Sequence, residues 1–225
     1  MEEIQSNQYV DETNNTMIKV FFRMFLGLLA TGLTAFYTYK SGLYISILSG
    51  MSYGVVALIE LVVVLVFSFL FKKLSPLAVT ILFYLYAFTN GITLSVIFAA
   101  FEINTIFWAL FATSLLFGGL ALYGYTTKRD MTKFSSILMV TLIAGVIVSL
   151  INLFIGNSLV EIVIDWVMLF VFCGFTIYDM NKIKNISQEL DGDYEKLYIY
   201  GAMQLYLDFI NIFIRILSIF GKRKN

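Results

Sequence analysis

Five ionisable side chains lie within apolar stretches of the sequence and are the residues best placed to do chemistry. They are Glu60, Asp165, Asp179, Asp208 and Arg215. A charged group costs at least about 2.5 to 3.5 kcal/mol at the centre of a bilayer, so each is a candidate functional residue. The sequence has no histidine and a single cysteine, which excludes His-based triads, His/Cys metal sites and an internal disulfide. We therefore expect no enzymatic activity and no bound cofactor.

The last apolar segment carries a polar helical face. Gly201, Gln204, Asp208, Asn211 and Arg215 follow one another at intervals of three and four residues, the spacing of one face of an α-helix. A polar face avoids lipid, so we expect this helix to be central and its polar face to line a wet cavity or meet polar partners. Asp208 and Arg215 are two turns apart, about 10 Å, which is too far for direct pairing.

Asp179 and Asp208 are predicted to face each other on the two arms of a helical hairpin. Residues 189–193 form a turn signal, and Asp191 within it is twelve residues from Asp179 and seventeen from Asp208. Their depths differ by about 7 Å, which helix tilt can remove. Two carboxylates in a low dielectric resist joint ionisation, so the pair is expected to share a proton and form a proton-sensitive latch or cation site. An isolated interfacial carboxylate is the simpler alternative for Asp179.

Glu60 and Asp165 are assigned less specific roles. Glu60 stands alone in an apolar stretch. It either pairs with Arg215 or a backbone group, or joins the two aspartates as an oxygen ligand of a hard cation such as calcium. Asp165 is expected at the membrane interface, near the outer end of its helix.

These residues require membrane-spanning helices to position them. The chain is 60% hydrophobic and 13% charged, with a mean hydropathy of +0.86, which excludes a soluble domain. Strand-like alternation is absent, and lipid requires internally bonded backbone, which leaves helices. We predict an all-α membrane protein, a seven-transmembrane-helix bundle with a central, polar-striped last helix. About 20 apolar residues cross a bilayer, and the stretches of that length are 18–39, 48–71, 76–101, 105–125, 134–154, 161 to about 184, and 197–220.

The chain is expected to form one membrane domain, residues 18–221, between a polar N-terminal tail, residues 1–17, and a basic C-terminal tail, residues 222–225. The N-terminal tail lacks the features of a cleaved signal peptide. If the spans alternate in direction, ten Lys and Arg residues lie on the same side of the membrane as the N-terminus and four lie on the opposite side. The side with more basic residues faces the cytoplasm, so the N-terminus is predicted to be cytoplasmic. Seven crossings export the C-terminal tail, whereas a re-entrant last segment keeps it inside. The net charge of zero says nothing about partners, and only the placement of charge along the chain is informative. Nucleic acid is not expected as a partner.

Two segments resemble signatures of the Bax inhibitor-1 family. They are residues 178–183, Tyr-Asp-Met-Asn-Lys-Ile, and residues 205–213, Leu-Tyr-Leu-Asp-Phe-Ile-Asn-Ile-Phe; residues 60–62, 91–95 and 127–130 resemble it too. The resemblance implies a bacterial-type member in the plasma membrane, with seven helices around the last one and a pH-sensitive calcium leak. Asp179 and Asp208 match the carboxylate pair that controls the leak. Some members carry a basic latch residue at the end of the second helix, and the nearest positions here are Lys72 and Lys73.

Three function classes follow. The first is a pH-sensitive calcium leak channel in which Asp179, Asp208, Glu60, Asn211 and Arg215 sense protons or line the ion pathway, with calcium held at the two aspartates. The alternative is a membrane-embedded regulator that binds a membrane protease or another membrane protein, as a cell-death or stress modulator without transport activity. An intramembrane aspartyl protease also places two aspartates on neighbouring helices. The glycine-rich and proline-led motifs of such proteases are missing, since the chain holds one proline.

Overall fold

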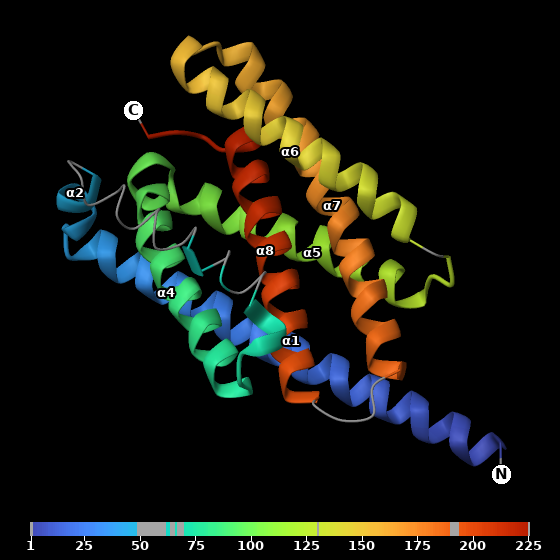
Figure 1. Cartoon of the computed structure of the whole chain (residues 1–225). Helices are drawn as coiled ribbons and strands as arrows, with labels where there is room; N and C mark the ends of the chain where they lie inside the picture. Colours follow the sequence, from blue (N-terminus) through green and yellow to red (C-terminus); the bar gives the residue numbers. More distant parts are fainter. Residues whose placement is uncertain are drawn as a thin grey trace. The chain divides into compact units, whose positions relative to one another are not determined.

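The computed structural model describes residues 2–48, 62–63, 66, 70–129, 131–189 and 194–224. Every regular element in these ranges is a helix, and one isolated bridge pairs Phe101 with Arg223. The elements, labelled in Figure 1, are α1 (Glu2–Lys40), α2 (Leu43–Leu48), the 3₁₀ helix η1 (Phe71–Lys73), α4 (Pro76–Ala100), α5 (Ile103–Thr126), α6 (Thr132–Ile155), α7 (Ser158–Glu189) and α8 (Tyr194–Phe220).

Six of the helices are long and apolar enough to cross a membrane. Their spans coincide with six of the seven predicted ones, and the all-α membrane class is confirmed. The remaining prediction, residues 48–71, lies mostly outside the residues that the structure describes. The six spans are Thr13–Lys40, Pro76–Ala100, Ile103–Thr126, Lys133–Asn152, Ser158–Ser187 and Tyr194–Phe220.

Local signals explain several helix ends. α4 begins at Pro76, because the first helical position needs no N–H partner, and the Ser75 hydroxyl accepts a hydrogen bond from the Ala78 N–H at 3.3 Å. Gly42, just after α1, and Gly156, at the end of α6, have φ angles of 75° and 68°. Glycine adopts this left-handed conformation without a Cβ clash, so the chain can turn sharply after each helix.

The chain divides into two compact units. Unit 1 comprises Met1–Glu102, Ser187–Tyr206 and Arg223–Asn225, and unit 2 comprises Ile103–Ile186 and Leu207–Lys222. The boundary therefore falls within α8. α1 is helical from Glu2 onward, so the residues expected to form a polar tail continue the first membrane helix.

In unit 1, α1 and α4 lie side by side (Figure 1). A Cβ atom on Gly91 of α4 would lie 2.6 Å from the carbonyl oxygen of Thr31 on α1, so only glycine permits this approach. The Thr31 hydroxyl donates to the Ala87 carbonyl at 2.8 Å, and the Tyr206 hydroxyl of α8 lies 2.6 Å from it. Because Thr31 has one hydroxyl proton, Tyr206 is the donor of this second bond. Three helices therefore meet at Thr31.

The contacts at the two ends of unit 1 show that α1 and α4 run in the same direction. At one end, Arg23 of α1 forms an ion pair with Glu195 in the first turn of α8. At the other end, the Lys224 ammonium donates to the Phe98 carbonyl at 2.8 Å and to the Tyr39 hydroxyl at 3.4 Å. Tyr39 and Phe98 are close to the C-terminal ends of α1 and α4, so both helices end on the same side.

In unit 2, α6 and α7 lie side by side as a hairpin (Figure 1). A Cβ atom on Gly174 of α7 would meet the Leu138 side chain of α6 at 2.7 Å. On α5, a Cβ atom on Gly124 would lie 2.5 Å from the Ile177 carbonyl oxygen of α7. The Asn181 amide donates to the Gly124 carbonyl at 3.3 Å and so fixes α7 against the end of α5.

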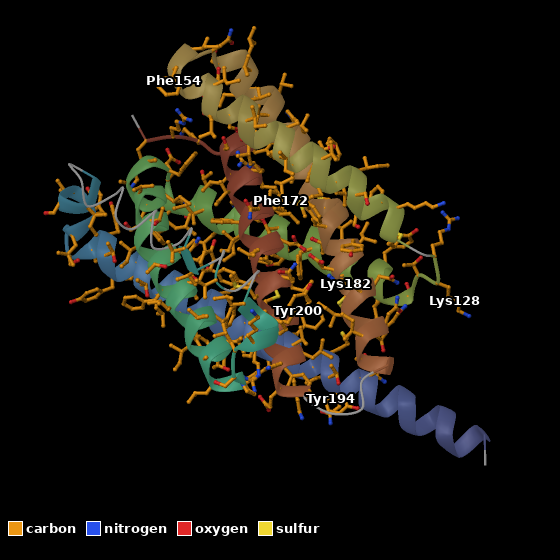
Figure 2. All side chains as sticks on the ribbon, in the orientation of Figure 1. Lys128, Phe154, Phe172, Lys182, Tyr194 and Tyr200 are labelled. Carbon is orange, nitrogen blue, oxygen red and sulfur yellow. The ribbon has the colours of Figure 1, made fainter. Side chains whose placement is uncertain are left out.

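Basic side chains gather toward one end of unit 2. Figure 2 shows Lys128 and Lys182 toward this end and Phe154 at the other. The Lys184 ammonium donates to the carbonyl of Thr127 at 2.9 Å, just after α5. A cation is favourable at the C-terminal end of a helix, where backbone carbonyls lack partners.

Candidate functional site

Asp179 on α7 and Asp208 on α8 come together within unit 2. Their side chains are buried, with 4% and 3% of their surface exposed, and the two carboxyl groups interact electrostatically. Thr176, one turn before Asp179, forms a side-chain hydrogen bond with Asp208, and its hydroxyl donates to the Phe172 carbonyl at 2.9 Å. The Oδ2 atom of Asp208 is buried and has no hydrogen-bond partner among the described residues.

The register of α7 against α8 explains this arrangement. The Ser218 hydroxyl bonds to the Asp165 carboxylate, so these two residues lie at the same depth on antiparallel helices. Asp208 is ten residues before Ser218 and is therefore level with Phe175, next to Thr176. Asp179 lies four residues beyond that level, about 6 Å along the axis. The two side chains are long enough to bridge this distance, so the carboxyl groups interact although the two residues are offset by about one helical turn.

A second polar cluster occupies the same two helices. Arg215 of α8 donates through Nη1 to Oδ1 of Asp165 at 2.5 Å, and the Ser218 hydroxyl donates to Oδ2 at 2.5 Å. Asp165 is 5% exposed. Both of its oxygens are bonded inside the protein, whereas its expected depth near the membrane interface stays a prediction. We call Asp165, Arg215 and Ser218 the Asp165 cluster.

Sequence reasoning missed the partners in both clusters, although the hairpin turn could have revealed them. Asp165 is 26 residues before Asp191 and Arg215 is 24 after it. Thr176 is 15 residues before this turn, and Asp208 is 17 after it. Residues equidistant from a hairpin turn lie at equal depth, so the same counting that joins the two aspartates predicts these pairs.

The five positions of the predicted polar face of α8 are divided between the two units. Gly201 and Gln204 belong to unit 1, whereas Asp208, Asn211 and Arg215 belong to unit 2. Asn211 donates to the Leu207 carbonyl of its own helix at 2.8 Å. The most apolar window of α8 is 56% buried, more than in the other five candidate spans. A single polar face along the whole of α8 stays a prediction.

Three predicted site residues have no described contact with the aspartates. Glu60 lies in the part of the chain that the structure leaves undescribed. Lys72 and Lys73 belong to η1 in unit 1, and Lys73 is exposed. The latch between a lysine and one of the aspartates therefore stays a prediction.

The aspartate pair provides few ligands for a metal ion. Calcium takes six to eight oxygen ligands. Over the described ranges, no group of three or more His, Cys, Asp or Glu side chains could hold a metal ion.

Comparison with known proteins places this arrangement in a family. Residues 13–225 match the family model described as inhibitor of apoptosis-promoting Bax1. The chain belongs to the Bax inhibitor-1 family. It is 37% identical over 214 residues to the inner membrane protein YbhL of Escherichia coli strain K12, covering 92% of each chain. It is 33% identical over 226 residues to an uncharacterized protein of Borreliella burgdorferi, covering 98% of this chain and 97% of the relative. An uncharacterized membrane protein of Streptococcus pyogenes serotype M3 is 38% identical over 203 residues, covering 86% and 88%.

Membership of the Bax inhibitor-1 family confirms the resemblance inferred from residues 178–183 and 205–213. With six candidate spans and an inner membrane relative, the chain is a multi-pass integral membrane protein. Two of the three relatives are named for a membrane location, and no name states an activity. The function is therefore argued from the site.

Proposed function

We propose that this protein is a pH-sensitive calcium leak channel of the bacterial plasma membrane, controlled by one proton shared between Asp179 and Asp208. Calcium is the transported ion. The protein would act without a catalytic residue or a resident cofactor.

Burial of the two acids is the observation that carries this proposal. Transfer of a carboxylate out of water is costly, and a second carboxylate nearby adds repulsion. The unpartnered Oδ2 of Asp208 has no donor among the described residues to offset this cost. One proton on the pair removes the repulsion, and its loss favours separation of α7 from α8 or entry of a cation. A proton and a divalent cation therefore compete for the same carboxyl groups.

Seven crossings with a cytoplasmic N-terminus complete the proposal. α1 and α4 run in the same direction within unit 1, which supports the predicted span 48–71, because two spans of the same direction call for one further crossing between them. Under the positive-inside rule the basic end of unit 2 faces the cytoplasm. An odd number of crossings from a cytoplasmic N-terminus exports the C-terminal tail.

Calcium flux into proteoliposomes, measured between about pH 6 and pH 8, tests the proposal. We expect a wild-type leak that changes with pH. The Asp208→Asn and Asp179→Asn variants are expected to respond by less than about twofold, because either substitution removes one of the two carboxyl groups that share the proton. Glu161→Gln is the matched control, since it removes an exposed carboxylate from the same helix as Asp179. A wild type without flux, or Asp variants with an unchanged pH response, refutes the channel and favours the regulator.

A further inference from the structure

The Asp165 cluster is an ion pair that the proposed gating mechanism does not use. Both oxygens of Asp165 are bonded, one to Arg215 and one to Ser218. The Arg215 side chain keeps 26% of its surface exposed, and its Nε atom is buried without a partner among the described residues. The arginine is therefore less completely satisfied than the aspartate.

Its position relates the cluster to the proposed ion path. Arg215 is seven residues after Asp208 on α8, about 10 Å along the axis, and Asn211 lies between them. Asp165 is fourteen residues before Asp179 on α7, about 21 Å along the axis. The cluster thus sits on the same two helices as the aspartate pair, nearer to the ends that carry Ser158 and Phe220. An ion that moved from the aspartates along α8 toward these ends would pass the level of Arg215.

We propose that the Asp165–Arg215 pair is a charge barrier that sets the rate at which cations pass along the α7–α8 hairpin. This inference rests on the proposed leak function. While the pair is intact, the aspartate compensates most of the arginine charge, but the Arg215 side chain keeps 26% of its surface exposed and therefore still repels a passing calcium ion weakly. Each oxygen of Asp165 already accepts a hydrogen bond, so a cation that binds Asp165 has to compete with Arg215 and Ser218.

A charge barrier and a purely structural ion pair predict different changes of calcium flux when one partner of the pair is replaced. Asp165→Asn leaves an uncompensated positive charge, which opposes entry of a divalent cation. Arg215→Gln leaves an uncompensated carboxylate, which attracts one. Breaking a buried ion pair destabilises a protein whichever partner is removed, so a structural role predicts losses of the same sign from both variants.

The test measures calcium flux in proteoliposomes for wild type, both single variants and the double variant Asp165→Asn/Arg215→Gln. We expect flux at least about tenfold lower for Asp165→Asn and at least about threefold higher for Arg215→Gln, because a unit charge acts strongly on a divalent ion over about 10 Å in a low dielectric. The double variant restores neutrality and is expected within about threefold of wild type. Ser218→Ala, which removes a hydrogen bond but no charge, is expected to change flux by less than about twofold.

Two outcomes overturn the charge barrier while leaving the leak intact. The first is a change of calcium flux in the same direction in the two single variants, and the second is a double variant whose flux does not return toward wild type. In both cases the leak itself is intact if the Asp208→Asn variant still loses its pH response. A wild type without flux refutes the proposed function itself. If a single variant does not fold, Asn211→Asp and Asn211→Lys introduce the two charges beside the intact pair. The barrier then requires higher flux for aspartate than for lysine, and equal flux refutes it.

Discussion

Gly124 lies where α5 meets the backbone of α7, close to the aspartate pair. A Cβ atom added there would lie 2.5 Å from the Ile177 carbonyl oxygen, 3.0 Å from the Ile177 Cα and 3.0 Å from the Met180 Cβ. Ordinary contact begins at 3.4 Å, so the two helices would have to separate by about 0.9 Å. None of these atoms belongs to the flexible end of a side chain, so the strain cannot relax by a rotamer change. Overpacking of this kind costs about 1 to 3 kcal/mol.

Gly118 is the matched control on the same helix. A Cβ atom at this position meets nothing within 4 Å. Alanine in place of a mid-helix glycine lowers backbone entropy in the unfolded chain and stabilises by about 0.5 to 1 kcal/mol, a gain that both variants share. We therefore expect Gly118→Ala to be more stable than wild type and Gly124→Ala to be less stable than Gly118→Ala by the overpacking cost.

Thermal unfolding of the two variants in the same detergent measures this difference. At about 2 to 4 °C per kcal/mol for a chain of this size, the midpoints should differ by about 2 to 12 °C. The fraction of monodisperse protein after heating, followed by size-exclusion chromatography, reports the midpoint. Equal midpoints would show that α5 and α7 are not packed as closely as the geometry of Gly124 implies.

Two further predictions concern polar contacts between helices. Tyr206→Phe removes the donor to Thr31, and we expect a loss of about 0.6 to 1.7 kcal/mol; in a double-mutant cycle with Thr31→Val, additive effects would show that the two hydroxyls do not interact. Lys184→Met removes the ammonium that bonds to the carbonyls of Tyr125 and Thr127. We expect about 0.5 to 1.5 kcal/mol of destabilisation and faster amide hydrogen exchange at the C-terminal end of α5. Unchanged exchange would contradict a stabilising role of the Lys184 ammonium at this helix end.

The sequence predicts the approach of Asp179 to Asp208, but it does not predict the partners of Asp165. Counting from the hairpin turn predicted that Asp179 and Asp208 approach each other, and the structure places both in unit 2 with interacting carboxyl groups. For Asp165, the position near a helix end predicts a depth near the interface, whereas the structure adds its partners Arg215 and Ser218. Position along a helix gives depth, but it does not give the direction in which a side chain points.

Sequence by itself determined the class of the protein and the approximate positions of six of its spans, although α1 begins well before the predicted residue 18. Long apolar runs must bond their own backbone in lipid, so their length and composition are enough to predict helical spans. Only the tertiary structure decided the partners of the ionisable groups. Arg215 had Glu60 as a candidate partner in the sequence, yet it bonds to Asp165 because the rotation and register of α7 against α8 bring that carboxylate to it. Rotation and register follow from side-chain packing across helices, such as the approach of Gly124 to Ile177, which no local pattern encodes.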